Sequence, residues 1–351
     1  MVTMREVAEA AGVSVMTVSN TLTGLRPVSP DTRRRVLEAV ERLGYQVNVA
    51  ARNLRRGRTG IVGLAVPELS GHYFGLLGSR LVARFAREGL RVVVEETGAS
   101  REGEMAALRD SRVNAYDGLV LSAVGLSEAE VEALGGDLPV VVLGERQAHR
   151  RVDHVRMANV AGAAAATRHL LERGCRRLGV VGAPPLDALG AAADGEGAQA
   201  FDLRAHGVLT ALREVPGASA VAASRGTDLA AGAACARELL AADRRLDGLV
   251  CVTDTLALGA LRGLADAGAR VPDDLLVIGF DDVDDARFSV PSLSSIAPGH
   301  EEMVEETVRL LLRRIDDRAA EPEVFTGPFT LVARESTGGR TRPLQVLRGQ
   351  A

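Results

Sequence analysis

The chain has 351 residues, which is more than one hydrophobic core usually serves, so two or three domains are expected. Its composition, 46% hydrophobic and 25% charged, is ordinary for a globular protein, and no run of about 18 uncharged apolar residues is present to span a membrane. The net charge of −4 conceals an asymmetry, because residues 1–58 carry +5 and the remainder carries −9. A basic head on an acidic body is expected where the head alone meets a polyanion such as nucleic acid.

The N-terminus and the cysteines favour a protein of the cytoplasm. Residues 1–6 contain no apolar signal region. Cys175, Cys235 and Cys251 lie far apart and form no CxxC pair, so neither a disulfide framework nor a metal site is expected. We expect all three to be small buried apolar residues.

Residues 3–23 predict two short helices joined by a tight turn. Thr3 can cap the first helix, and Glu6 three residues later completes a capping box. Gly12 is expected to end this helix, and Ser14 can cap the next one. Two short helices with such a connection form a helix-turn-helix. The inner stripe of the second helix is expected to be Val15, Val18 and Leu22.

A third helix is expected to complete the head. It starts at Ser29, or at Asp31 beyond Pro30, and ends at Gly44. The buried side of this helix is expected to be Val36, Leu37, Val40 and Leu43.

This region resembles the head of the LacI/GalR repressor family. The resemblance lies in VTMREVAEAAGVSVMTVSN (residues 2–20), in VSPDTRRRV (residues 28–36) and in LGY (residues 43–45). Several fixed positions match over about 55 residues without a gap, so the signal is far more specific than a helix-turn-helix pattern alone. The resemblance implies a DNA-binding head with its hinge over residues 1–58.

By this resemblance, the second helix enters the major groove and reads bases near its N-terminal end. Val15, Met16 and Asn20 would face the bases, and Asn20 stands where a basic residue is often found, which favours adenine over guanine. The alternative for Val15 and Met16 is packing in the core of the head. The short hydroxyl side chains suited to phosphate contacts are Ser14, Thr17, Ser19 and Thr23.

Residues 48–55 resemble the hinge helix of the family. The resemblance implies that Ala51 and Leu54 enter the minor groove, where Leu54 acts as a wedge, and that Asn48 and Arg55 also contact DNA. The alternative for Leu54 is packing within the linker. Val47 stands where family members often have proline, so the hinge helix lacks a preset first turn.

From residue 60 onward, apolar strand-like runs alternate with helical stretches. This alternation predicts an α/β core of parallel sheets flanked by helices, with enough strands for two lobes and a ligand at the strand carboxyl ends between them. The expected strands are 61–66, 91–94, 118–121, 140–143, 178–181, 221–223, 248–252 and 276–279. The expected helices include 75–88, 162–173, 204–215, 229–242, 255–267 and 301–315.

Residues 59–338 resemble the core of the same family and, through it, the periplasmic sugar-binding proteins. The best match runs from TDTLALGAL (residues 253–261) through VPDDL (271–275) to VIGFDD (277–282). By similarity, this effector-binding and dimerisation core has one lobe of about residues 60–160 and 298–322 and another of about 161–297 and 323–338. Residues 339–351 form a tail outside the resemblance, without leucine heptads for a tetramerising coil.

The resemblance also implies which residues contact an effector. Tyr73 and Phe74 match ring-stacking positions, Arg204 matches an arginine that binds polar groups, and Asp281 matches an acid that binds hydroxyls or amines, with Asp254 nearby. The alternative for Asp254 and Asp281 is a structural role, in which they cap helices or satisfy backbone groups.

Three features of the core depart from the family pattern. Gly144, with Glu145 beside it, replaces the usual acid after one strand, and Ala158-Asn159 replaces the usual Asp-Asn at the first crossing between lobes. Residues 183–202 form a longer segment than usual, rich in alanine and glycine. An atypical effector or a mobile lid would account for this segment.

No motif of a known catalytic constellation is present, and no cofactor is expected. The pattern predicts no metal site either, because the six histidines do not cluster at ligand spacing; they are His72, His149, His154, His169, His206 and His300.

The sequence therefore predicts a repressor that binds a palindromic double-stranded operator as a homodimer, with an affinity modulated by a small molecule between the lobes. A sugar or sugar derivative is favoured, and a nucleobase or nucleoside stays open. One alternative is a regulator with an atypical or protein effector. Another is a solute-binding protein, against which the DNA-binding head and the missing signal region argue.

Overall fold

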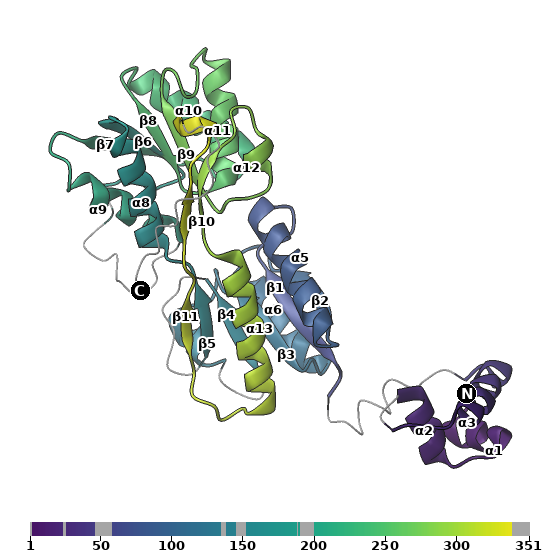
Figure 1. Cartoon of the computed structure of the whole chain (residues 1–351). Helices are drawn as coiled ribbons and strands as arrows, with labels where there is room; N and C mark the ends of the chain where they lie inside the picture. The colour runs from purple at the N-terminus through teal and green to yellow at the C-terminus, as the bar shows by residue number, and fades with distance from the viewer. Residues whose placement is uncertain are drawn as a thin grey trace. The chain divides into compact units, whose positions relative to one another are not determined.

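The computed structural model describes residues 2–23, 26–45, 58–134, 138–144, 152–187, 189 and 200–338 (Figure 1). The chain divides into two compact units, residues 1–59 and residues 60–351. No helix in the described ranges has the length and apolar content needed to cross a membrane.

The described residues of the first unit form three helices, α1 (Met4–Ala11), α2 (Val15–Thr23) and α3 (Pro30–Leu43). The predicted capping box of α1 is confirmed, since Thr3 N donates to Glu6 Oε2 (2.6 Å) and Glu6 N donates to Thr3 Oγ1 (3.3 Å). Gly12 ends α1 with a left-handed φ of 64°, and Ser29 caps α3 as expected. Capping signals thus locate both ends of α1 and the start of α3.

A small apolar cluster holds the three helices together. Two predictions about it are wrong, because Leu37 is 44% exposed and Val15 is 37% exposed. On α3 the buried stripe includes Ala39 instead, since residues three or four apart share a helix face and position 37 turns away from Val36. Val15 belongs to the first turn of α2, ahead of the point where the helix meets the core. The buried members of the cluster are Val7, Ala8, Ala11, Val18, Val36, Ala39 and Tyr45.

The second unit contains two lobes, each built on a six-stranded sheet. The first sheet is wholly parallel, and alternate strand residues face opposite layers of helices. Its strands, in spatial order, are β11 (Val324–Thr326), β5 (Asp153–Arg156), β4 (Val140–Leu143), β3 (Gly118–Ser122), β1 (Ile61–Val66) and β2 (Arg91–Glu96). Its helices are α5 (His72–Arg87) and α13 (His300–Asp316) on one face and α6 (Arg101–Val113) and α7 (Glu128–Glu132) on the other.

The second sheet is parallel except for one edge strand, β12, which runs antiparallel to β10. Helices α10 and α11 pack very closely, since a Cβ on Gly259 would lie 2.1 Å from Leu229 O. The strands, in spatial order, are β12 (Thr330–Val332), β10 (Ser294–Ala297), β9 (Leu276–Phe280), β8 (Gly248–Cys251), β6 (Arg177–Val181) and β7 (Ser219–Ala223). The helices are α8 (Asn159–Glu172), α9 (Ala200–Leu212), α10 (Leu229–Ala242), α11 (Asp254–Asp266), α12 (Asp285–Phe288) and the 3-10 turn η1 (Glu335–Thr337).

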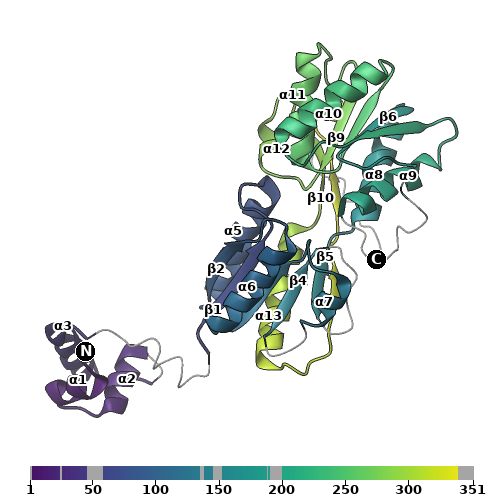
Figure 2. The same ribbon diagram turned by 180° about the vertical axis from the view of Figure 1, so that it is seen from behind.

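The described strands imply three passages of the chain between the two lobes, and Figure 2 shows the connecting segments between the lobes. The crossings follow β5, β10 and β11. The third one lies later than expected, because β11 pairs with β5 of the first sheet and the chain leaves that lobe only after Thr326. The expected boundary at residue 322 is therefore wrong by one short strand.

Candidate functional site

The N-terminal turn of α2 presents apolar side chains to solvent. Met16 is 68% exposed and Val15 is 37% exposed, so neither is buried in the core of the head. Ser14 caps the helix, since its Oγ accepts from Thr17 N (3.1 Å) and lies 2.9 Å from Thr17 Oγ1. Asn20, just over one turn further along, is half-buried. The exposed apolar turn next to polar side chains has the composition of a base-reading surface.

Of the remaining predicted DNA contacts, two lie on α2 and the others lie outside the described residues. Ser19 lies within α2 and is half-buried, and Thr23 is the last residue of that helix. The predicted hinge residues, Asn48, Ala51, Leu54 and Arg55, lie outside the described residues.

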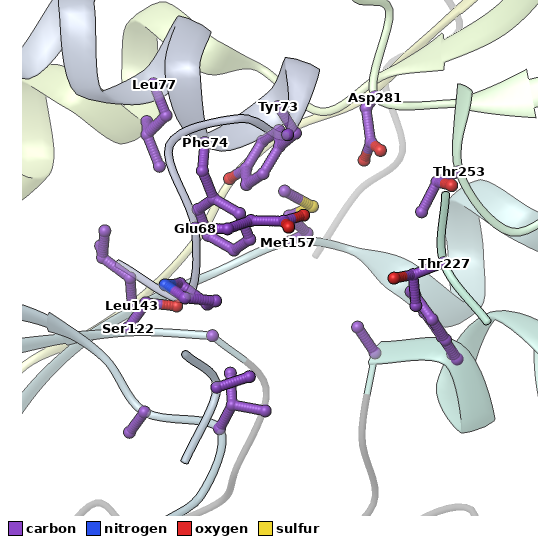
Figure 3. Close-up of a pocket in the computed structure, with 18 of the residues that line it drawn as sticks. Glu68, Tyr73, Phe74, Leu77, Ser122, Leu143, Met157, Thr227, Thr253 and Asp281 are labelled. Atoms are coloured by element: carbon purple, nitrogen blue, oxygen red, sulfur yellow. The ribbon is translucent and has the colours of Figure 1, made fainter. Parts of the chain in front are cut away.

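A cavity of about 620 Å³ lies between the two lobes, where the carboxyl ends of both sheets meet (Figure 3). The first lobe contributes Glu68 after β1 and Ser122 at the end of β3, and the second contributes Thr253 after β8 and Asp281 after β9. Ligand sites form at this edge of parallel sheets because every strand ends there and the loops carry the side chains. The cavity size is that of a small-molecule site.

The first turn of α5 supplies an aromatic wall to the cavity. The ring centroids of Tyr73 and Phe74 lie 5.0 Å apart with planes at 70°, an edge-to-face pair. The Tyr73 ring also lies 5.8 Å from the His300 ring at the start of α13. The predicted ring-stacking residues thus line the cavity together, in a fixed geometry.

Arg204, on α9, lines the cavity, and its guanidinium is hydrogen-bonded and ion-paired within the protein. Its Nε donates to Asn159 Oδ1 (2.7 Å), its Nη1 donates to Val252 O (2.5 Å), and its Nη2 lies 3.2 Å from Asp281 Oδ1. The guanidinium also stacks over the Phe280 ring, 3.8 Å from its centroid. These contacts fix the position of Arg204 before any ligand arrives.

Asp281 faces the cavity from a strained backbone. Its φ of 112° lies in the left-handed region, which a residue with a side chain rarely adopts. Two hydrogen bonds hold the backbone there: His300 Nε2 donates to Asp281 O (2.6 Å), and Asp281 N donates to Ile296 O (2.8 Å). Burial raises the pKa of its carboxyl to about 6, although the Arg204 guanidinium opposes this shift. Among the described residues, Oδ1 has no hydrogen-bond partner, although it forms the ion pair with Arg204. The carboxylate can therefore accept a hydrogen bond from a ligand.

Asp254 lies behind the cavity wall and is not among the residues that line it. It is fully buried, where its Oδ1 accepts from Ser295 Oγ (2.6 Å) and its Oδ2 from Val283 N (3.0 Å). Burial, together with the nearby charge of Asp281, raises its pKa well above the usual value. This placement fits a structural role, in which Asp254 anchors the loop that carries Asp281.

Sequence reasoning missed several residues that the fold brings to the cavity. The rule that ligands bind at strand carboxyl ends would have found Glu68 and Thr253, which follow β1 and β8 within two residues. The same rule applies to Met157, which directly follows β5, but that strand was not among the expected ones. It does not apply to Thr227, which lies in the loop before α10. Gly144, one of the departures from the family pattern, also lines the cavity.

Other groups that often carry chemistry are placed in structural roles. No set of three or more His, Cys, Asp and Glu side chains in the described ranges is positioned to hold a metal ion. The three cysteines are free and buried, as expected, and burial raises the pKa of Cys175 to about 12. Such thiols are poor nucleophiles.

Comparisons with known proteins agree for both units of the chain. Residues 3–48 match the family of bacterial regulatory proteins of the lacI type, and residues 167–337 match a periplasmic binding protein-like domain. The ribose operon repressor of Halalkalibacterium halodurans is 30% identical over 339 residues, which cover 97% of this chain and 98% of that protein.

Two solved structures extend this agreement to the fold. A LacI-family regulator from Sanguibacter keddieii is 39% identical with a TM-score of 0.71, covering 81% of this chain and all of that one. The transcriptional regulator CelR, solved in complex with cellobiose, is 27% identical with a TM-score of 0.66, covering 96% of this chain and all of that one. The chain therefore belongs to the LacI family of bacterial transcriptional regulators.

Proposed function

We propose that this protein is a transcription repressor whose α2 helix reads a palindromic operator and whose affinity for that operator changes when a small molecule binds between the lobes of its core. The exposed apolar turn at Val15 and Met16 is the observation that best supports DNA binding by α2. Exposed apolar side chains lower solubility and gain nothing for folding, whereas contact with thymine methyl groups in the major groove would bury them.

The cavity supports a sugar as the small molecule. It combines an aromatic wall, Tyr73 and Phe74, with the carboxylate of Asp281, which can accept from a hydroxyl. A relative is named a ribose operon repressor, and CelR was solved with cellobiose. Stacking on an apolar sugar face together with acceptors for its hydroxyls would account for both kinds of lining residue.

Binding between the lobes would act through the angle between them. Outside the cavity the lobes already touch at the start of α5, where His72 Nδ1 lies 3.2 Å from Thr255 Oγ1 and His72 Nε2 lies 3.6 Å from Asp285 Oδ2. A ligand held by both lobes shifts their angle only if it binds the two arrangements unequally. In this proposal the core binds and signals without catalysis, and the protein works in the cytoplasm, where its operator is.

The experiment that tests the proposal is a selection of short genomic DNA fragments bound by the purified full-length protein. The selection is run alone and with a panel of sugars and nucleosides. We expect one palindromic sequence to be enriched and one sugar to change its recovery. Binding without sequence preference in every condition would contradict the proposal.

A further inference from the structure

The cavity holds an excess of negative charge among the described residues that line it. Three of them are carboxylates, Glu68, Glu96 and Asp281, and a single one, Arg204, is a guanidinium. Asp281 lies 3.2 Å from the guanidinium and so offsets its charge. The positive charge of Arg204 is therefore not available to balance the negative charge of a ligand group.

Glu68 is the carboxylate that is held least by the protein itself. No hydrogen bond or ion pair joins it to another residue within the described ranges, whereas Glu96 Oε1 accepts from Leu69 N (2.6 Å). Figure 3 shows the Glu68 side chain extending from the first lobe toward the wall that carries Thr227 and Asp281. A ligand in the cavity would meet its carboxylate directly.

The start of α5 explains why Glu68 lies there. Gly71, the residue before the helix, provides no side-chain cap, and a Cβ at this position would lie 2.6 Å from Glu68 Oε1. The glycine thus leaves room for the carboxylate beside the positive end of the helix. An anionic ligand group would otherwise find an attractive place at this helix end.

We propose that the cavity takes an effector without negative charge, a neutral or aminated sugar rather than a sugar phosphate or nucleotide, and that Glu68 enforces this choice. The inference rests on the proposed function in one respect, namely that this cavity is the effector site. A hydroxyl or ammonium group can donate to Glu68, whereas a phosphate would face a like charge. When a bound ligand displaces water, screening falls and this discrimination grows.

The test is a calorimetric titration of full-length protein with two anionic probes, inorganic phosphate and glucose 6-phosphate. The variants are Glu68→Lys and, as a matched control, Glu102→Lys, which makes the same charge change at an exposed site on α6 that does not line the cavity. We expect Glu68→Lys to bind glucose 6-phosphate at least about tenfold more tightly than wild type, because repulsion becomes attraction. Glu102→Lys should behave as wild type.

Two outcomes overturn the inference: wild type binding either probe as tightly as Glu68→Lys does, or Glu68→Lys showing no gain over Glu102→Lys. Glu68→Gln provides a second variant that removes the charge without adding one, and a smaller gain is expected for it. Operator binding by wild type is measured separately. If no operator is found, the proposed function is contradicted, whereas the charge selectivity of the cavity is still decided by the titration.

Discussion

At the scale of single residues, the exposed turn of α2 gives the sharpest expectation for DNA binding. Val15, Met16 and Asn20 are the predicted base contacts, and the structure leaves the first two at the surface of the head. A side chain that reads a base contributes to one sequence and little to others. Substitution there should therefore change preference as well as affinity.

We expect Asn20→Ala to weaken operator binding by about 1–3 kcal/mol and to relax the preference at one base pair of each half-site. The measurement is a fluorescence titration against the selected operator and its single-base variants. Leu37→Ala is the control, because Leu37 is also exposed in the head but lies on α3. Equal losses for every operator variant would mean that Asn20 contacts the phosphate backbone or only supports the fold.

In the core, Asp281 is the residue whose loss should separate sensing from DNA binding. Its carboxylate lines the cavity, and no predicted DNA contact lies on the same unit of the chain. We expect Asp281→Asn to retain operator affinity within about twofold and to reduce the response to the effector sugar by about tenfold or more, since an amide is a weaker acceptor than a carboxylate. A titration of operator complex with that sugar checks this, and an unchanged response would contradict the assignment.

At the scale of elements, strands made of apolar residues could be predicted from the sequence, whereas a strand with buried polar residues could not. Strand β1 is a continuous apolar run and was predicted at its full length. Strand β5 was missed because its Asp153 and His154 look exposed in the sequence, yet both are buried. Asp153 is paired with Arg313 and Arg314 of α13, about 160 positions away along the chain, and no local pattern contains that information.

The cavity contains both residues that the sequence predicts and residues that it does not. Tyr73, Phe74, Arg204 and Asp281 were placed by family resemblance, and all four line the cavity. Glu68 could have been proposed as a cavity residue because it closely follows β1, but the space that Gly71 leaves for its carboxylate is defined only in the folded chain.

Helix α8 carries a histidine that links protonation to stability. His169 Nδ1 lies 3.2 Å from Arg173 Nη1, which can only donate, so the ring proton lies on Nε2 and is donated to Thr337 Oγ1 (2.9 Å). Burial and the charge of Arg173 lower the pKa of His169 to about 4, from 6.5 in the unfolded chain. The neutral ring thus ties α8 to η1.

Because the folded-state pKa is lowered, the contribution of His169 is fully present above pH 6.5 and is lost as pH falls from 6.5 toward 4. Within this window we expect the free energy of unfolding to fall by up to about 1.4 kcal/mol per pH unit from this group. His169→Gln should flatten that part of the curve, as measured by urea unfolding at pH 5, 6 and 7. The same variant at His206, which is half-buried on α9, is the control. Identical slopes for wild type and His169→Gln would rule out this linkage.

At the scale of the whole molecule, a regulator that grips a palindrome must pair with a second copy of itself. Phe288 and Val290 are 83% and 95% exposed, the most exposed large apolar side chains in the described part of the chain. Both lie at α12 and the loop after it in the second lobe. Such side chains stabilise a dimer when the partner protein buries them in the interface.

We expect the double variant Phe288→Asp with Val290→Asp to shift the protein from dimer to monomer at micromolar concentration and to lower operator affinity at least about tenfold. Sedimentation velocity measures the first effect and operator titration the second. Val221→Asp, on the edge strand β7, introduces one charge at another exposed apolar site and serves as the control. A double variant that stays dimeric would place the pairing surface elsewhere.

The third crossing between the lobes also delays the completion of both sheets while the chain is being synthesised. The head closes its own core within residues 2–45, so it can fold as soon as that stretch leaves the ribosome. The first sheet gains its edge strand only at Thr326, and the second waits for β12. The nascent chain therefore acquires its DNA-reading surface some 280 residues before either sensory lobe is complete, and a message truncated within that interval would yield a head that no effector controls.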